Sequence, residues 1–200
     1  MQKDRKLYLF IIACVRGIMK LLGYRILNKD RIKNAQNCII AANHISLLDP
    51  PFIGSIFKKE ISILAKSELF KNKLFGGLIR YLNAIPIKRG RIDRDAISKV
   101  TNILNEGGSL LLFPEGTRKS DTAKPGIGKI ALQTQKDILP VFIQNSTDFL
   151  GCLFRKKRLK IVIGEKIKTK DYIDGEITKD SYRSFAEMVL SRINELENEC

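Results

Sequence analysis

The sequence predicts a single three-layer α/β domain, a mostly parallel sheet flanked by helices, preceded by an N-terminal membrane-interfacial helix. The chain has 200 residues, which is enough for one domain with a sizeable core. Short apolar runs alternate with segments whose apolar residues recur at helical spacing, and no repeat or long linker divides the chain. We therefore assign residues 1–25 to the helix and residues 26–200 to the domain.

The N-terminal helix is expected to lie in a membrane interface. Nine apolar residues, 7–15, follow a basic start, but Arg16 and Lys20 interrupt the stretch before it reaches the roughly 20 residues that a membrane span needs. A one-sided helix fits better, with both cations reaching lipid phosphates. A cleaved signal peptide and a helix packed on its own domain are the alternatives. The residues expected to face acyl chains are Leu9, Phe10, Ile12 and Leu22.

A strand and a helix are expected to enclose the first polar loop. The apolar run 38–42 has the length of a buried parallel strand. Asp49 precedes Pro50-Pro51, and an acidic residue before proline is a good N-cap, so a helix is expected from Asp49 to about residue 58. The loop therefore lies at the carboxyl end of a strand, where α/β folds place their ligands.

The next elements are a strand, a helix and an edge strand. Residues 61–65 form a short apolar run typical of a strand, and residues 74–82 indicate a helix that contains two glycines. The extended segment 84–87 contains Pro86, which favours an edge strand or the start of a strand.

A helix and a buried strand lead to a second polar loop. In residues 95–106 the apolar side chains recur at helical spacing, and Gly107-Gly108 ends the helix. The apolar residues 109–113 predict a strand, and the turn-forming loop 114–118 follows it directly.

The last third of the chain alternates in the same way. Pro125-Gly126 opens a helix expected to end at residue 135, and the apolar runs 139–143 and 159–163 predict strands. Residues 178–197 carry one apolar stripe at helical spacing, which indicates a helix packed on the core.

The composition favours anionic partners and free thiols. The formal net charge of +15 indicates binding to nucleic acid, an anionic bilayer, acidic metabolites or an acidic carrier protein. Four scattered cysteines are too far apart in sequence for a zinc site and too few for a disulfide scaffold, which suggests a reducing compartment. We expect no metal site and no cofactor.

Two polar loops carry the candidate catalytic groups. His44 is the only histidine, and Asp49 is a carboxylate that could fix its tautomer and stabilise its protonated form. Glu115 and Arg118 occupy the second loop. Because both loops follow buried strands, we expect them to face each other across a cleft. The alternative is a structural histidine beside a helix-capping aspartate.

These loops resemble those of the glycerolipid acyltransferases, specifically the 1-acylglycerol-3-phosphate acyltransferases that make phosphatidic acid. The resemblance covers most of the chain in the right order. It includes the family's pattern of a histidine, four residues and an aspartate, and a complete match in the second loop. The matching blocks are residues 43–49, 83–89, 113–118 and 138–143.

The resemblance implies an acyltransferase domain that needs no covalent acyl-enzyme. His44 would be the general base that removes the proton from the free hydroxyl of a lysophospholipid, and Asp49 would orient and charge-stabilise it. The alkoxide would then attack an acyl thioester of coenzyme A or of an acyl carrier protein. Two departures from the family pattern lie in the second block, at Asn83 and Lys88.

The same resemblance implies the substrate-binding residues. Arg89 and Arg118 would bind the acceptor's phosphate, because guanidinium groups can do so bidentately. Glu115 would help to bind the glycerol part or hold Arg118 in an ion pair, Gly116 would let backbone approach the ligand, and Thr117 completes this block. Two further basic residues could contact ligand: Lys66 and Lys124.

Other functions compete with this hypothesis. A nucleic-acid-binding module would suit the charge, but the basic runs 88–91 and 155–158 lack interleaved aromatic residues. A non-catalytic membrane-binding protein and an acyltransferase for another lysolipid are further alternatives. We expect no nucleic acid as partner, and we expect the protein at the cytoplasmic face of a membrane, peripheral or monotopic through its N-terminal helix.

Overall fold

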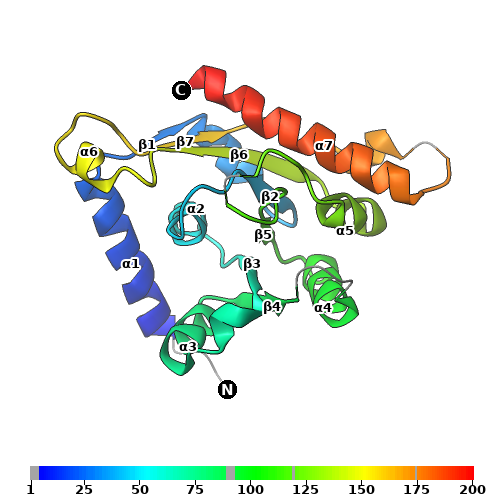
Figure 1. Ribbon diagram of the computed structural model, residues 1–200, viewed down its shortest axis with the longest axis horizontal. Helices are drawn as coiled ribbons and strands as arrows, with labels where there is room; N and C mark the ends of the chain where they lie inside the picture. The colour runs from blue at the N-terminus through cyan, green and yellow to red at the C-terminus, as the bar shows by residue number, and fades with distance from the viewer. Residues whose placement is uncertain (1–4, 89–92, 119, 174) are drawn as a thin grey trace.

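The computed structural model describes residues 5–88, 93–118, 120–173 and 175–200, which form a seven-stranded sheet covered by helices (Figure 1). The strand order is β1-β7-β6-β2-β5-β3-β4, and each neighbouring pair is parallel except β6 and β7. The predicted mostly parallel α/β fold is confirmed. The strands are β1 (Arg25–Leu27), β2 (Ile39–Ala42), β3 (Ser62–Lys66), β4 (Ala84–Ile87), β5 (Leu110–Leu112), β6 (Ile138–Gln144) and β7 (Lys160–Ile163).

Helices cover both faces of the sheet, as the three-layer prediction requires. Figure 1 shows α1 and α2 on one face and α4, α5 and α7 on the other. The α-helices are α1 (Arg5–Leu21), α2 (Asp49–Ile56), α3 (Lys73–Tyr81), α4 (Arg94–Asn105), α5 (Gly126–Thr134), α6 (Phe149–Leu153) and α7 (Lys179–Glu195). The 3-10 helices are η1 (Lys29–Asn34), η2 (Ser67–Phe70), η3 (Thr169–Tyr172) and η4 (Leu196–Glu199).

The central strand β2 contributes to the core on both faces. Side chains alternate across a strand, so Ile40 and Ala42 pack with α1 and α2, while Ile39 and Ala41 pack with α4, α5 and α7. All four residues are fully buried. This double burial explains why a central parallel strand is apolar throughout instead of alternating between apolar and polar residues. The strand also fixes where the first polar loop begins.

Two strand neighbours bring the polar loops together. β2 pairs with β5 on one side and β6 on the other, with Ile39 opposite both Leu110 and Ile138. Because these pairs are parallel, the carboxyl ends of all three strands meet at one edge of the sheet. The predicted edge strand also holds, since β4, which contains Pro86, is the last strand of the sheet.

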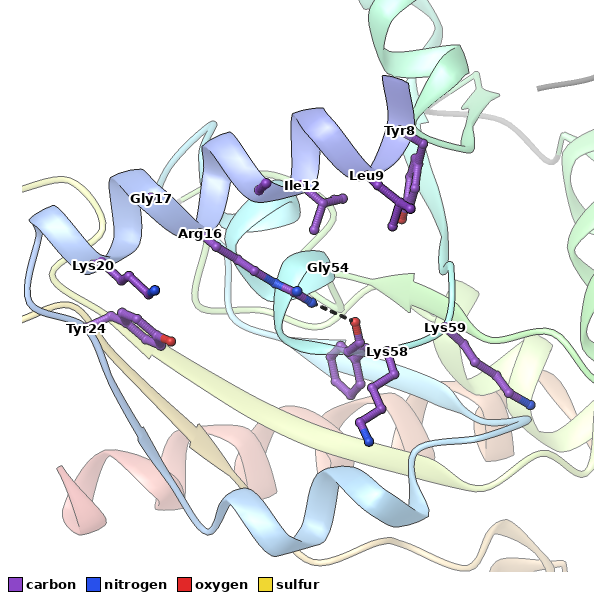
Figure 2. Close-up of a pocket in the computed structure, with 12 residues that line it drawn as sticks. Tyr8, Leu9, Ile12, Arg16, Gly17, Lys20, Tyr24, Gly54, Lys58 and Lys59 are labelled. Atoms are coloured by element: carbon purple, nitrogen blue, oxygen red, sulfur yellow. Dashed lines mark hydrogen bonds between the residues drawn. The ribbon is translucent and has the colours of Figure 1, made fainter. Parts of the chain in front are cut away.

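The helix α1 packs on the domain through one face, which corrects part of the prediction. Met19 and Leu22 lie in the core, so Leu22 does not face acyl chains. Arg16 donates from Nε to the carbonyl oxygen of Ser55 at 2.9 Å and from Nη2 to that of Phe57 at 3.5 Å. The dashed line in Figure 2 marks the second of these bonds. Carbonyls at the end of a helix lack intrahelical donors and carry partial negative charge, which attracts this guanidinium in place of a lipid phosphate.

Two apolar side chains in the first half of α1 are exposed in the folded chain. Leu9 is 55% exposed and Phe10 65% exposed, whereas Ile12 is partly buried. No helix in the described ranges is long and apolar enough to cross a membrane. A pocket of about 440 Å³ lies between α1 and α2, where Lys58 and Lys59 extend away from Arg16 (Figure 2). This pocket adjoins the carboxyl end of α2.

Candidate active site

Two hydrogen bonds of the Asn43 side chain fix the start of the first polar loop, where it leaves β2. This buried side chain donates from Nδ2 to the carbonyl oxygen of Ile143 at 3.0 Å, and its Oδ1 accepts from the Ile143 amide at 2.7 Å. A side-chain amide thus continues the pairing of β2 with β6 by one step beyond the last strand residue, Ala42. The backbone at His44 is therefore anchored to two strands.

His44 and Asp49 form a buried pair. The ring nitrogen Nδ1 lies 2.9 Å from Asp49 Oδ2. Asp49 is fully buried, and His44 is 9% exposed. A carboxylate only accepts hydrogen bonds, so Nδ1 carries the proton in the neutral ring and Nε2 keeps a lone pair. That arrangement leaves Nε2 able to take a proton from a substrate.

The Asp49 carboxylate is held by three further donors. The amides of Ile45 and Ser46 each donate to Oδ2 at 2.7 Å, and the Ser146 hydroxyl donates to Oδ1 at 2.5 Å. These contacts correct the prediction that Asp49 is the N-cap of α2. Leu48 occupies the N-cap position, and Asp49 is the first residue of the helix. Because its carboxylate turns back to the preceding loop, the bonds that fold the loop also orient His44.

The second loop contacts the first directly. Glu115 is buried and its Oε2 accepts from the His44 backbone amide at 2.8 Å. The Phe113 ring stacks on the His44 ring with centroids 4.2 Å apart and an interplanar angle of 26°. The second loop therefore fixes the position of His44 through its backbone amide, which donates to Glu115, and through its ring, which Phe113 contacts.

The environment of Glu115 raises its pKa to about 7. The largest cause is burial, which disfavours the charged form. The His44 amide opposes this change, while the negative charges of Asp49 and Asp121 add to it. Near neutral pH this carboxyl group can therefore donate a hydrogen bond as well as accept one.

The rest of the second loop presents polar groups to solvent. Gly116 adopts φ +69°, a conformation that favours glycine, and a Cβ there would lie 3.0 Å from Cγ of Lys124. Thr117 and Arg118 are exposed. The ion pairs among the described residues do not include the alternative pair of Glu115 with Arg118.

Three further basic residues were predicted to contact substrate. Arg89 lies outside the described residues. Lys66 is exposed and pairs with Glu68 at 3.6 Å, and the exposed Lys124 borders Gly116. Within the described residues, no three His, Cys, Asp or Glu side chains gather as metal ligands would.

Sequence reasoning missed two residues of the site. Ser146 follows β6 by two residues, and a serine in an otherwise unremarkable loop gives no signal before strand neighbours are known. Phe113 was expected to end a strand and to begin the matching block 113–118, but no contact with His44 was predicted for it, and it follows the last residue of β5. Its ring contact with His44 depends on β2 and β5 being neighbours.

A buried imidazole–carboxylate pair set between two loops of an α/β sheet is an arrangement that general-base catalysts use. Comparison with known proteins narrows the class. Residues 23–144 match the family model described as Acyltransferase, and the chain belongs to this family.

Relatives of the chain share one name. The 1-acyl-sn-glycerol-3-phosphate acyltransferase of Bacillus subtilis is 29% identical over 196 residues, covering 96% of this chain and 98% of the relative. The protein of that name from Streptococcus pneumoniae is 33% identical, covering 84% of this chain and 65% of the relative. The family resemblance predicted from the loops is confirmed.

A solved structure shares the fold. The crystal structure of the 1-acyl-sn-glycerophosphate (LPA) acyltransferase, PlsC, from Thermotoga maritima is similar with a TM-score of 0.63 and 24% sequence identity. The similarity covers 98% of this chain and 84% of that chain. It supports the architecture described above.

Proposed function

We propose that the protein transfers a fatty acyl chain from an acyl thioester to the free hydroxyl of 1-acyl-sn-glycerol-3-phosphate, which yields phosphatidic acid. The observation that carries the proposal is the buried His44–Asp49 pair with its free Nε2. The shared name of the relatives supports this choice of acceptor. The acyl donor is a substrate, either acyl-CoA or acyl carrier protein, and the reaction uses no cofactor.

The proton and the acyl group move in opposite directions. His44 Nε2 takes the proton from the acceptor hydroxyl, and Asp49 stabilises the imidazolium that forms. The acceptor oxygen bonds to the thioester carbonyl carbon, the carbon–sulfur bond breaks, and the leaving thiolate takes the proton from the imidazolium. A positioned general base of this kind typically contributes about 10²–10⁴-fold to the rate.

The second loop is proposed to hold the acceptor. Arg118 is exposed beside the site and binds the phosphate together with Arg89. Glu115, Gly116 and Thr117 bind the glycerol part, because the loop that carries them already contacts the His44 backbone through Glu115. With the acceptor bound in this way, we expect its hydroxyl to lie next to His44.

The protein is proposed to work at the cytoplasmic face of a membrane, held peripherally or monotopically by α1. The exposed apolar side chains of α1 support this location, with Phe10 at 65% and Leu9 at 55% exposed. The charge of +15 favours an anionic surface, where each nearby basic residue contributes about 1 kcal/mol.

Thioester turnover by the purified protein tests the proposed reaction. Acceptors would include 1-acylglycerol-3-phosphate, its phosphate-free analogue and other lysolipids, each offered with acyl-CoA and with acyl carrier protein. We expect turnover with the phosphate-bearing acceptor and a loss of about 10²–10⁴-fold in Asp49→Asn. Turnover with another lysolipid alone would show that the proposed acceptor is wrong. Absence of acyl transfer to every acceptor would refute the proposed acyltransferase activity.

A further inference from the structure

The short helix α6 and the basic run that follows it form a surface that the proposed reaction does not explain. Three of its apolar side chains are exposed, Phe149 at 42%, Leu150 at 65% and Phe154 at 69%. Leu150 and Phe154 are four residues apart, and the Phe154 amide donates to the Leu150 carbonyl at 3.0 Å, so their side chains share one helical face. Exposed large apolar groups gathered on one element mark an interaction site.

The backbone that carries these side chains is firmly held. Asp148 accepts from the Gly151 amide at 2.9 Å and from Lys157 Nζ at 2.7 Å. The Asn145 side chain donates to the Arg158 carbonyl at 2.9 Å, and Cys152 is buried in the core. Phe149, Leu150 and Phe154 therefore project from a fixed support, which lowers the conformational cost of docking.

Four cations follow the apolar side chains directly. Arg155, Lys156, Lys157 and Arg158 are all exposed, and of these only Lys157 forms an ion pair within the described part of the chain. The Arg155 guanidinium lies against Gly23, next to the carboxyl end of α1. Figure 1 shows α6 beside that end of α1. The basic run thus joins α6 to the helix already proposed to meet lipid.

We propose that α6 is a second membrane-docking element, which inserts Phe149, Leu150 and Phe154 among lipid chains while residues 155–158 bind anionic headgroups. This inference rests on the proposed membrane location and deepens it. Apolar groups flanked by cations fit a lipid surface, which offers apolar chains beneath negative charge. An acidic carrier protein would also meet the cations, but three exposed apolar side chains favour the bilayer.

The position of α6 couples docking to the active site. Ser146, whose hydroxyl holds Asp49, precedes Phe149 by three residues, a distance that extended chain spans in at most about 11 Å. A bilayer docked on α6 therefore lies close to the loop that orients His44. A lipid acceptor would then reach the base without leaving the surface.

Vesicle binding by substituted proteins tests whether α6 contributes to membrane docking. Phosphatidylcholine vesicles with and without phosphatidylglycerol would be sedimented with the wild type, Leu150→Ser/Phe154→Ser and Lys156→Glu/Arg158→Glu. We expect each double variant to bind anionic vesicles at least roughly ten-fold more weakly at an unchanged Tm. The matched charge control is Lys179→Glu/Arg183→Glu at the start of α7, far from α6 in Figure 1, which should bind like the wild type.

A fluorescent probe tests insertion itself. The chain has no tryptophan, so Phe154→Trp introduces a single one. Its emission should be quenched by lipids brominated in the acyl chains, whereas Tyr172→Trp, a half-exposed position packed against Phe185, should not be quenched. An unquenched probe at residue 154, or unchanged vesicle binding by Leu150→Ser/Phe154→Ser, would overturn the proposal.

Two other outcomes are distinguishable. If these variants lost binding to acyl carrier protein and kept full vesicle binding, α6 would be a protein-docking site and the proposal would be wrong. Turnover of short-chain, water-soluble substrates reports on the proposed function separately. A wild type that binds vesicles through α6 but transfers no acyl group would refute the proposed function and leave α6 as a docking element.

Discussion

At the scale of residues, the site depends on one carboxylate that serves several donors. Asp49 is fully buried, yet its two oxygens receive His44, two loop amides and the Ser146 hydroxyl. A buried charge is tolerated only when it is well paired and hydrogen-bonded. The same four bonds that make Asp49 tolerable in the core also fix the orientation of the imidazole.

Ser146→Ala tests this shared role. The change removes the donor to Asp49 Oδ1 but leaves the His44 contact on Oδ2 in place. We expect a loss of about 1–3 kcal/mol in the free energy of unfolding, measured in urea, because a buried acceptor loses its partner. We also expect kcat to fall with little change in KM, since Ser146 acts through Asp49. Ser146→Thr, which keeps the hydroxyl, should recover part of both losses.

Glu115 should make stability depend on pH. Its pKa is raised to about 7 in the folded state, above the ordinary value of 4.5, so the folded protein binds more protons than the unfolded chain between these values. The stabilisation is fully present below pH 4.5 and is lost as pH rises through about 7. Glu115→Gln keeps an acceptor for the His44 amide but does not titrate.

Urea unfolding between pH 4 and pH 8 measures this effect. The wild type should lose stability relative to Glu115→Gln as the pH rises across that window. Parallel pH profiles for the two proteins would contradict the raised pKa.

At the scale of elements, the local sequence pattern predicted individual strands and helices, but it did not predict which of them are neighbours in space. The apolar run 38–42 and the stripe in 178–197 identified β2 and α7, since each pattern follows from burial of the element itself. The three-residue strand β1 and the five-residue helix α6 are too short to give a periodic signal, and both were missed. The contact of Arg16 with α2 was missed because it joins residues 39 apart.

In the candidate site too, features within one short motif could be predicted, and features that depend on neighbouring strands could not. The His44–Asp49 pair could be predicted because both residues belong to one short recognisable motif, five residues apart in the sequence. The roles of Ser146 and Phe113 could not, because they depend on β6 and β5 lying on either side of β2. The N-cap assignment for Asp49 was wrong because the rule for acidic residues before proline ignores competing amides in the preceding loop.

Arg16→Ala tests the attachment of α1. Loss of the contacts with the Ser55 and Phe57 carbonyls should reduce the free energy of unfolding by about 1–3 kcal/mol, because these carbonyls at the end of α2 lose a charged donor. Lys20→Ala is the control on the same helix, and its exposed side chain predicts a change within about 0.5 kcal/mol. Equal stability of the two variants would contradict the assigned role.

At the scale of the whole molecule, the N-terminal segment combines core packing with exposed apolar side chains. Met19 and Leu22 belong to the core, so deletion of residues 1–22 would remove core packing as well as any lipid contact. Substitution of the exposed side chains is therefore the cleaner experiment. The charge of +15 adds a salt-dependent attraction to anionic lipid.

Leu9→Ser/Phe10→Ser should weaken binding to anionic vesicles at least roughly ten-fold and leave Tm unchanged, since both side chains are exposed in the folded chain. Sedimentation at low and high salt measures the two contributions separately. Binding equal to that of the wild type at every salt concentration would refute the interfacial role of α1.

The central claim is that His44 is the base of an acyl transfer, and turnover by His44→Ala tests it most directly. Steady-state kcat with 1-acylglycerol-3-phosphate and an acyl thioester would be compared with that of the wild type, with the fold checked by circular dichroism. We expect kcat to fall by about 10²–10⁴-fold in a folded variant. A folded His44→Ala protein whose kcat stays within a few-fold of the wild type would contradict the claim.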